Sequence, residues 1–441
     1  YAVVRNILEA KGYMLSYPGL SLLGAGSGVD RGGNYNERFS NHFRVSGTKL
    51  ISVSASGTVV ELGTVSGSEQ VAMPYSFNTQ CVIADGKMFL YSSGGGFVEV
   101  TDSDLGNPID AVWVDGYYFL TDGEYIFHTD ISDETAIDPL KFATAEFMPD
   151  PTLGLAITQD NKVIVFARYT LEYFVNVATD NFAFQRVQTT AQKIGIVATH
   201  AKCESKGVFY ITGGRKEESV SIHAVTVGSS QKISSREIDK VLAEYTEPEL
   251  SDMRMEARTE GNVTFIIIHL PNETLCFNES IAATFGLESA WMILKTDVQG
   301  NSPYRGINGI FDARSAKWIY GDKINSNIGV LDNDISTHYD EIVEGIFYTP
   351  FMNIEAKSID SLELNTIPGH TTAEDATVGF SLTTDGLTYT PETWIMYGEP
   401  LDYGERFIQR RIGYVREWIG FKFRTASTSR MAFSMLRIGY G

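Results

Sequence analysis

One local pattern recurs along this chain of 441 residues: an apolar strand, a tight turn, and a second apolar strand. Seven copies begin at or near His42, Cys81, Ala111, Leu155, Ala201, Ala257 and Gly309. Their starts are 30 to 56 residues apart. Self-similarity at this period, in units of short strands, is typical of a β-propeller, because one blade cannot bury its apolar faces alone. We therefore predict an all-β fold with a propeller of six to eight blades over residues 35–340.

The texture changes after about residue 340. Strands without the repeated pattern are expected at Phe347–Phe351, Ser361–Asn365, Val378–Thr383, Leu387–Tyr389, Phe421–Arg424 and Met431–Ile438. Thr384-Asp385-Gly386-Leu387 predicts a hairpin, since Asp-Gly suits the positive-φ positions of a two-residue turn. Residues 341–441 are expected to form a C-terminal β-sandwich or a β domain that closes the ring. Residues 1–34 are assigned to an N-terminal extension or arm.

One helix interrupts the β rhythm. Ser234 with Glu237 three residues later forms a capping-box pattern, and apolar residues from Ile238 to Tyr245 fall at helical spacing. A helix inserted between propeller strands lies at a rim, where it either meets partners or covers a blade edge. The sequence leaves both readings open.

Catalytic signatures are absent from the sequence. The seven histidines, among them His269 and His370, show no metal-ligand spacing, and no Gly-x-Ser-x-Gly sequence occurs. His269 alternates with apolar neighbours and is interpreted as a satisfied strand histidine. We predict no enzyme, no catalytic residue, no cofactor and no metal.

Targeting and redox features are equally plain. The longest apolar run, residues 263–268, is too short to span a membrane. The three cysteines are odd in number and widely spaced, which favours reduced thiols and folding in a cytoplasm. Two other functional classes stay open at this point. A carbohydrate-binding or sialidase-like propeller requires Arg, Glu and Tyr at a central pocket. Ser381–Tyr389 resembles the Asp-box turn of sialidase propellers, but its Asp-Gly is explained as a hairpin turn. A cellular interaction scaffold requires a partner-sized surface patch.

Charge is unevenly distributed. The formal net charge is −20. Fourteen acidic residues, including Glu146, and one basic residue lie between Phe97 and Asp160, whereas Arg406 to Arg437 holds eight basic residues and one acidic residue. A free-standing DNA binder is disfavoured, because affinity for nucleic acid comes from neutralising phosphates. The acidic segment is either a solvated face, a surface for basic partners, or a wall past which DNA slides.

Several short stretches match a known family in order. They are Gly12-Tyr13, Tyr17-Pro18-Gly19, Ile238–Tyr245, Ile267–Pro271, Leu294–Thr296, Gly321–Lys323, Tyr348–Pro350, Thr383–Gly386, Glu399-Pro400 and Gly420–Arg424. The chain thereby resembles the tail hub proteins, or packaged-DNA stabilisation proteins, of short-tailed, tailspike-bearing lambdoid phages. The matches run from about residue 12 to residue 424 and are sparsest over residues 80–235.

The resemblance implies a structural virion protein of the phage tail. Hubs of this kind form a homo-oligomeric ring, expected to be a hexamer, around the double-stranded DNA channel, which DNA passes without specific binding. Their partners are the adaptor or connector protein below the portal, the tail needle and the tailspike. The implied role is to retain the packaged genome until ejection.

Two sets of site residues follow from charge and resemblance together. We expect Asp102, Asp104, Asp110 and Asp115 to face the DNA channel, where an acidic wall keeps the duplex mobile. We expect Arg410, Arg411 and Arg416 to dock a neighbouring subunit or a partner.

Overall fold

The fold is described from a computed structural model. It describes every residue except 1–3, 6, 11–12, 132, 146, 367–370, 372, 375 and 405, so Gly12, Glu146 and His370 lie outside the described residues. Strands hold 54% of the residues and helices 6%, which confirms the all-β prediction. The chain packs as two units. We call residues 23–271 with 306–328 the propeller unit, and residues 1–22, 272–305 and 329–441 the sandwich unit.

The propeller unit is a succession of small antiparallel sheets. The first has β5 (Asp30–Asn36), β6 (Asn41–Ser46), β7 (Lys49–Val53) and β8 (Val59–Thr64). The second has β9 (Gln80–Ala84), β10 (Lys87–Ser92) and β11 (Gly96–Glu99). The third has β12 (Asp110–Val114), β13 (Tyr117–Thr121), β14 (Ile126–Asp130) and β15 (Asp133–Ala143).

The fourth sheet has β16 (Thr152–Ile157), β17 (Val163–Ala167), β18 (Leu171–Asn176) and β19 (Phe184–Arg186), followed by the short 3-10 helix η1 (Gln188–Thr190). The fifth has β20 (Gly195–Ile196), β21 (Lys202–Ser205), β22 (Val208–Gly214), β23 (Ser221–Thr226) and β24 (Ser229–Lys232). Two further hairpins complete the unit: β25 (Arg254–Glu260) with β26 (Val263–His269), and β29 (Gly306–Asp312) with β30 (Lys317–Asp322).

All seven copies of the repeated sequence pattern form antiparallel hairpins. Turn chemistry explains the clearest ones. Asp85 and Gly86 have φ angles of 53° and 67°, and Asp115 and Gly116 have φ angles of 50° and 94°. Two consecutive positive φ angles make the turn whose twist matches the flanking strands. Seven hairpins in the described chain agree with the predicted six to eight blades.

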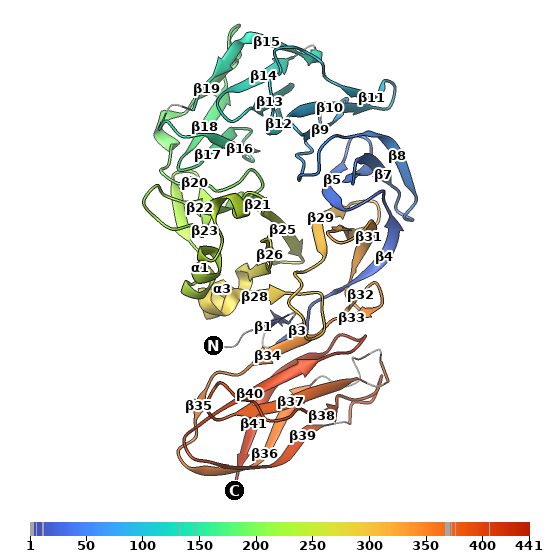
Figure 1. Ribbon diagram of the computed structural model, residues 1–441, viewed down its shortest axis with the longest axis vertical. Helices are drawn as coiled ribbons and strands as arrows, with labels where there is room; N and C mark the ends of the chain where they lie inside the picture. Colours follow the sequence, from blue (N-terminus) through green and yellow to red (C-terminus); the bar gives the residue numbers. More distant parts are fainter. Residues whose placement is uncertain are drawn as a thin grey trace. The chain divides into compact units, whose positions relative to one another are not determined.

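Within the propeller unit the sheets follow one another in chain order around a common centre, and β29 lies beside β5 (Figure 1). Apolar side chains fill the spaces between neighbouring sheets. Phe43 and Val45 pack with Val82 and Phe89, and Val114 packs with Val165 of the fourth sheet. Burial between blades is the main stabilising contribution, since a single hairpin has no partner for its faces.

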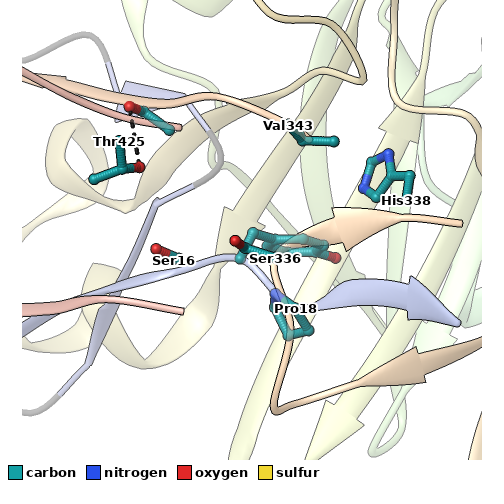
Figure 2. A pocket seen from close by; sticks show the side chains of 8 residues that line it. Ser16, Pro18, Ser336, His338, Val343 and Thr425 are labelled. Carbon is teal, nitrogen blue, oxygen red and sulfur yellow. Dashed lines mark hydrogen bonds between the residues drawn. The ribbon is translucent and has the colours of Figure 1, made fainter. Parts of the chain in front are cut away.

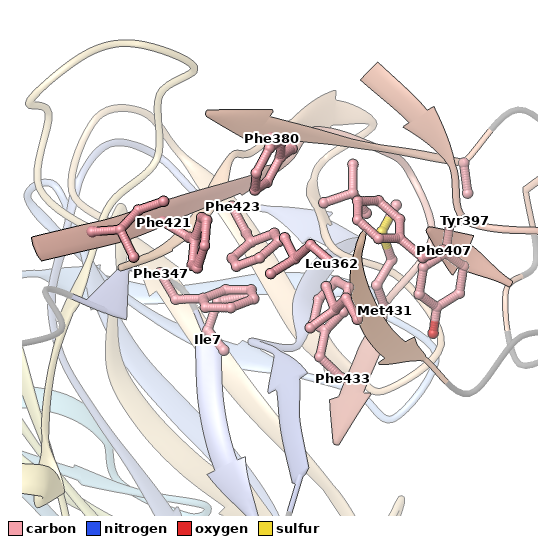
Figure 3. Close-up of a cluster of buried hydrophobic side chains, with 14 of the residues drawn as sticks. Ile7, Phe347, Leu362, Phe380, Tyr397, Phe407, Phe421, Phe423, Met431 and Phe433 are labelled. Atoms are coloured by element: carbon pink, nitrogen blue, oxygen red, sulfur yellow. The ribbon is translucent and has the colours of Figure 1, made fainter. Parts of the chain in front are cut away.

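In the sandwich unit, two sets of paired strands form the β-sandwich. One contains β2 (Ile7–Ala10), β3 (Tyr13–Ser16), β41 (Ala432–Tyr440), β36 (Lys357–Thr366) and β39 (Phe407–Val415). The other contains β1 (Val4–Arg5), β34 (Gly345–Tyr348), β40 (Trp418–Thr425), β37 (Thr377–Thr383) and β38 (Thr393–Met396), and β35 (Met352–Asn353) pairs with β40. Aromatic side chains from both sheets meet in its core, among them Phe347, Phe380, Phe407, Phe423 and Phe433 (Figure 3).

The same unit holds a hairpin of β27 (Thr274–Asn278) and β28 (Trp291–Leu294), with α3 (Glu279–Phe285) and the 3-10 helix η2 (Leu287–Ala290) between them. The short strands β32 (Thr337–His338) and β33 (Glu341–Ile342) pair with each other. β4 (Gly19–Ala25) and β31 (Asn327–Asp332) each carry the chain from one unit into the other. The predicted domain limits 1–34, 35–340 and 341–441 stay predictions.

Two predictions about the helices need correction. The inserted helix α1 (Arg236–Ala243) is capped by Ser235, whose side chain accepts from the Ile238 amide, and not by Ser234. The hydroxyl of Ser234 instead donates to Asp239 (2.6 Å). The described residues hold two more α-helices, α2 (Glu247–Leu250) and α3, and Thr246 with Glu249 forms the capping box of α2.

The predicted two-residue hairpin turn at residues 384–387 is wrong, and Leu387–Tyr389 is not a strand. The Asp385 carboxylate accepts from the amides of Leu387 (2.9 Å) and Thr388 (2.8 Å). These bonds and those from the Thr383 and Thr388 hydroxyls lower the pKa of Asp385 well below its usual range. The side chain thus forms a local turn, and β37 pairs with β38 across a longer loop.

Candidate interaction surfaces

The four predicted channel-facing aspartates do not form one cluster. Asp102 and Asp104 share a turn, in which the Asp102 carboxylate accepts from the amides of Asp104 (2.9 Å) and Ile137 (3.1 Å). Asp104 is exposed, whereas Asp102 is half-buried. Asp110 and Asp115 lie at opposite ends of β12, about 17 Å apart at the usual rise of a strand.

Asp110 is buried and joins three sheets. Its carboxylate lies 2.7 Å from the Lys202 ammonium and accepts from the Leu155 amide (2.8 Å). A Cβ added at Gly154 would lie 2.7 Å from Lys202 Nζ, so the glycine leaves room for the ion pair. Asp110 therefore presents a neutralised pair, and not a free charge, to any surface.

Asp115 is exposed at the turn after β12, and its carboxylate accepts from the side-chain amides of Asn161 and Asn176. Other acids of the segment serve the local backbone. Asp122 accepts from the amides of Glu124 and Tyr125, and Asp150 accepts from the Tyr169 amide. These amide donors bring no positive counter-charge to the carboxylates. The segment thus combines turn-forming chemistry with a negative surface.

The basic stretch divides into paired and exposed residues. In the sandwich unit Arg424 contacts Glu392 and Glu344, and burial opposes but does not cancel the rise in the Arg424 pKa that Glu392 causes. Arg406 donates to both carboxylate oxygens of Glu363.

Arg410, Arg411 and Arg416 are exposed, and none of them forms an ion pair within the described part of the chain. Arg410 and Arg411 lie on β39, the last strand of its sheet. A β-bulge opposite Asp360 gives Arg411 a φ of 59°. Arg416 directly follows the last residue of β39. The structure therefore leaves the three predicted docking arginines free at a sheet edge.

The centre of the propeller unit holds buried ion pairs that the sequence analysis did not identify. Arg44 donates to Asp30 through Nε (2.7 Å) and Nη2 (2.9 Å), and Asn308 donates to the same carboxylate (2.7 Å). Asp30 and Asn308 come from β5 and β29, so these bonds link the first and last hairpins of the unit.

His269 is a buried strand histidine, as expected, with Glu256 as its neighbour. Its Nε2 lies 3.2 Å from Glu256 Oε1, while Glu256 Oε2 accepts from the Gly309 amide (2.8 Å). Burial lowers the pKa of His269 to about 4, and Lys323 acts in the same direction. Burial alone raises the pKa of Glu256, but His269 and the Gly309 amide bring it below its usual value. The pair belongs to the interior of the unit.

A polar pocket of about 800 Å³ opens in the propeller unit. Its lining includes Glu69, Asp85, His200 and Asp252 but, among the described residues, neither Arg nor Tyr. Burial and the neighbouring Arg254 hold the pKa of His200 well below its usual range. The Arg, Glu and Tyr cluster that a sialidase-like site requires is therefore not assembled in this pocket.

A small cavity of about 10 Å³ in the sandwich unit is lined by Ser16, Pro18, Ser336, His338 and Thr425 (Figure 2). It has the volume of about one water-sized probe, so it suits a buried water and not a ligand. No group of three or more His, Cys, Asp or Glu side chains in the described part of the chain is placed to hold a metal. None of the described helices has the length and apolar character needed to cross a membrane.

These features define a class of protein: a β-propeller followed by a β-sandwich, with exposed charged residues on both units. The chain belongs to the bacteriophage P22 Gp10 family, whose β-propeller model matches residues 1–336 and whose β-sandwich model matches residues 344–441. The match confirms the resemblance inferred from short collinear segments. Both families are structural, and no enzyme family is indicated.

A relative is the tail hub protein gp10 of Salmonella phage P22, with 29% identity over 453 residues, covering 99% of this chain and 93% of that protein. Two solved structures are more distantly similar. A streptogramin B lyase has a TM-score of 0.45 and 13% identity, covering 73% of this chain and 99% of its own. The extracellular domain of a putative one-component system from B. thetaiotaomicron has a TM-score of 0.47 and 10% identity, and the match covers 92% of this chain and 58% of that one. TM-scores this low bear on neither mechanism nor partners.

Proposed function

We propose that this chain is the tail hub of a short-tailed phage, a structural virion protein that forms a ring around the DNA channel. The observation that carries the proposal is the match to the P22 tail hub protein along 99% of the chain. In this role the ring, expected to have six copies, follows the adaptor protein below the portal. It holds the tail needle, helps to carry the tailspikes and retains the packaged genome.

A closed ring requires a heterologous interface, in which two different surfaces of the subunit meet. The edge of β39 is our candidate for one of these surfaces, because Arg410, Arg411 and Arg416 are exposed there without carboxylate partners in the described chain. The opposing surface is expected to be acidic. The net charge of −20 means that such surfaces are abundant on this chain.

We further propose that Asp102, Asp104 and Asp115, called the acidic set below, face the DNA channel or its entrance. A basic lumen would hold the duplex through many phosphate contacts and delay its exit. Carboxylates repel it over a Debye length of about 8–10 Å, so the DNA stays centred while the needle closes the channel. Asp110 is not in this set, because Lys202 neutralises it in the interior.

The test is to delete the gene from the phage that encodes it and to supply the chain in trans. Purified tails are then weighed by native mass spectrometry. We expect six copies per tail, and particles without the chain should lose their DNA. Phage particles that lack the chain but retain their DNA would exclude the role of a hub. A copy number that is not six would exclude the hexamer.

A further inference from the structure

The propeller unit has an aromatic pocket of about 550 Å³ whose lining includes neither the arginines of β39 nor the acidic set. Tyr75, Phe77 and Trp113 contribute rings to it, and Met73, Val112 and Ile157 contribute apolar side chains. Its residues come from β5 and the turn after it, from the segment before β9, and from β12 and β16. Pockets that combine several aromatic rings with a few polar groups are characteristic of binding sites for small groups and peptide segments.

Three side chains, Arg38, Phe77 and Trp113, contact one another in sequence at the pocket. The Phe77 ring is 54% exposed and lies edge-to-face against the Trp113 indole, with 4.8 Å between ring centroids. The Arg38 guanidinium lies 4.0 Å from the centroid of the Phe77 ring. Arg38 is exposed and has no ion-pair partner in the part of the chain that the structure describes. On a chain of net charge −20, this cation is available to an external carboxylate.

Trp113 supplies a second, independent observation. Its Nε1 is buried and finds no hydrogen-bond acceptor among the described residues. Buried donors are nearly always paired, so an unpaired one requires an explanation. An acceptor brought by a ligand would provide it, because a buried tryptophan N–H usually finds a hydrogen-bond partner, and aromatic-lined grooves are one place where extended segments dock.

The loop that carries Phe77 is held in place. Thr79 Oγ1 lies 2.8 Å from the Tyr118 hydroxyl and donates to Glu134 (2.7 Å). The amide of Thr79 also donates to Ser76 Oγ (2.9 Å). The backbone around Phe77 is therefore preorganised. Preorganisation lowers the entropic cost of binding.

We propose that this pocket binds an extended segment of a partner protein that places one apolar side chain among the aromatic rings and a carboxylate against Arg38. A backbone carbonyl of the segment accepts from Trp113 Nε1. Glu37 lies beside Tyr75, so the acidic residue of the segment is directed to the Arg38 side. This partner site is separate from the proposed ring contact at β39, but it lies on β12, the strand that Asp115 of the acidic set directly follows.

The test uses the full chain with ¹⁵N-labelled tryptophan, in which the Trp113 indole signal is assigned with Trp113→Phe. The probe is the blocked peptide acetyl-Gly-Leu-Pro-Glu-Gly-amide, whose proline favours an extended backbone. Two matched peptides replace its Glu by Lys or its Leu by Ala. We expect a saturable shift of the Trp113 signal with the Leu-Pro-Glu peptide, and weaker binding of both controls.

Variants then locate the contacts. Arg38→Glu should weaken binding of the acidic peptide roughly two- to fivefold, which corresponds to an exposed ion pair, and should favour the Lys peptide. Arg215→Glu, a charge reversal at another exposed arginine, and Phe142→Ala, a loss of another exposed ring, should leave binding unchanged. Absence of a saturable Trp113 shift, equal binding of the Glu and Lys peptides, or an unaltered affinity in Arg38→Glu would overturn the proposal.

Discussion

The buried pair of Asp110 and Lys202 makes a sharp prediction about the propeller unit. Their side chains are 5% and 13% exposed, and the carboxylate also accepts from the Leu155 amide. Asp110→Ala leaves the ammonium without its counter-charge and the buried amide without an acceptor. Removing one partner of a buried pair typically costs about 3–5 kcal/mol. An unsatisfied buried donor accounts for about 1–3 kcal/mol of such a loss.

Two companion variants separate these contributions. Asp110→Asn keeps a side-chain oxygen that the Leu155 amide can reach, so it should cost less than Asp110→Ala. The double variant Asp110→Asn with Lys202→Met removes both charges. It should be less destabilised than the sum of the two single variants by about 0.5–3 kcal/mol, the usual range for coupled neighbours.

The assay is thermal and urea unfolding of the purified chain, followed by circular dichroism. At roughly 2 °C per kcal/mol, the shift that applies to large domains, Asp110→Ala should lower Tm by about 6–10 °C. Asp104→Ala is the matched control from the same acidic segment. It is exposed, so its effect should stay within about 0.5 kcal/mol. Equal effects of the two variants, or strict additivity in the double variant, would refute the view that burial separates these aspartates.

Three further predictions concern assembly, ejection and acid stability. The double variant Arg410→Glu with Arg411→Glu should not be incorporated into tails, although its Tm stays unchanged. The control, Arg215→Glu with Lys216→Glu on the exposed surface of the propeller unit, should be incorporated normally. If the variant at residues 410 and 411 is also incorporated normally, the edge of β39 is not part of the interface. Changing the acidic set to Asn should leave capsids filled but slow DNA ejection at low ionic strength, with the defect shrinking as salt rises; a normal rate at low salt excludes the channel wall. Burial lowers the pKa of His269 from 6.5 to about 4, so between these values the unfolded chain binds more protons and stability falls as pH falls. His269→Asn should flatten the decline in Tm between pH 6.5 and 4, and an unchanged slope would show that other groups govern it.

Local chemistry explains what could be predicted. The two-residue turns at 85–86 and 115–116 require positive φ at both residues. Asp followed by Gly meets this requirement, so the turns can be predicted from two neighbouring residues alone. Exposure of Arg410 and Arg411 is also a local matter, since β39 presents them beside a bulge. Reasoning from the local sequence gave the wrong turn at Asp385. There the Asp385 side chain accepts from the amides of Leu387 and Thr388, and the expected two-residue turn does not form.

Long-range pairing explains what could not be predicted. β1 pairs with β34 and β3 pairs with β41, so the first strands of the chain join sheets built from its last hundred residues. No spacing within residues 4–16 carries that information, because the partner strands lie more than 300 residues away. The aromatic pocket likewise combines residues near 38, 75, 113 and 157.

The sequence by itself determined the seven hairpins, the β-rich class and the segregation of charge, because each depends on turn residues, strand periodicity or composition over short windows. Only the tertiary structure decided which of the charges act at a surface. Asp104 and Asp110 are the same residue type six positions apart, but one faces solvent and the other meets Lys202 from a different sheet. Burial and counter-charge come from segments distant in sequence, and these two quantities set what a carboxylate can do.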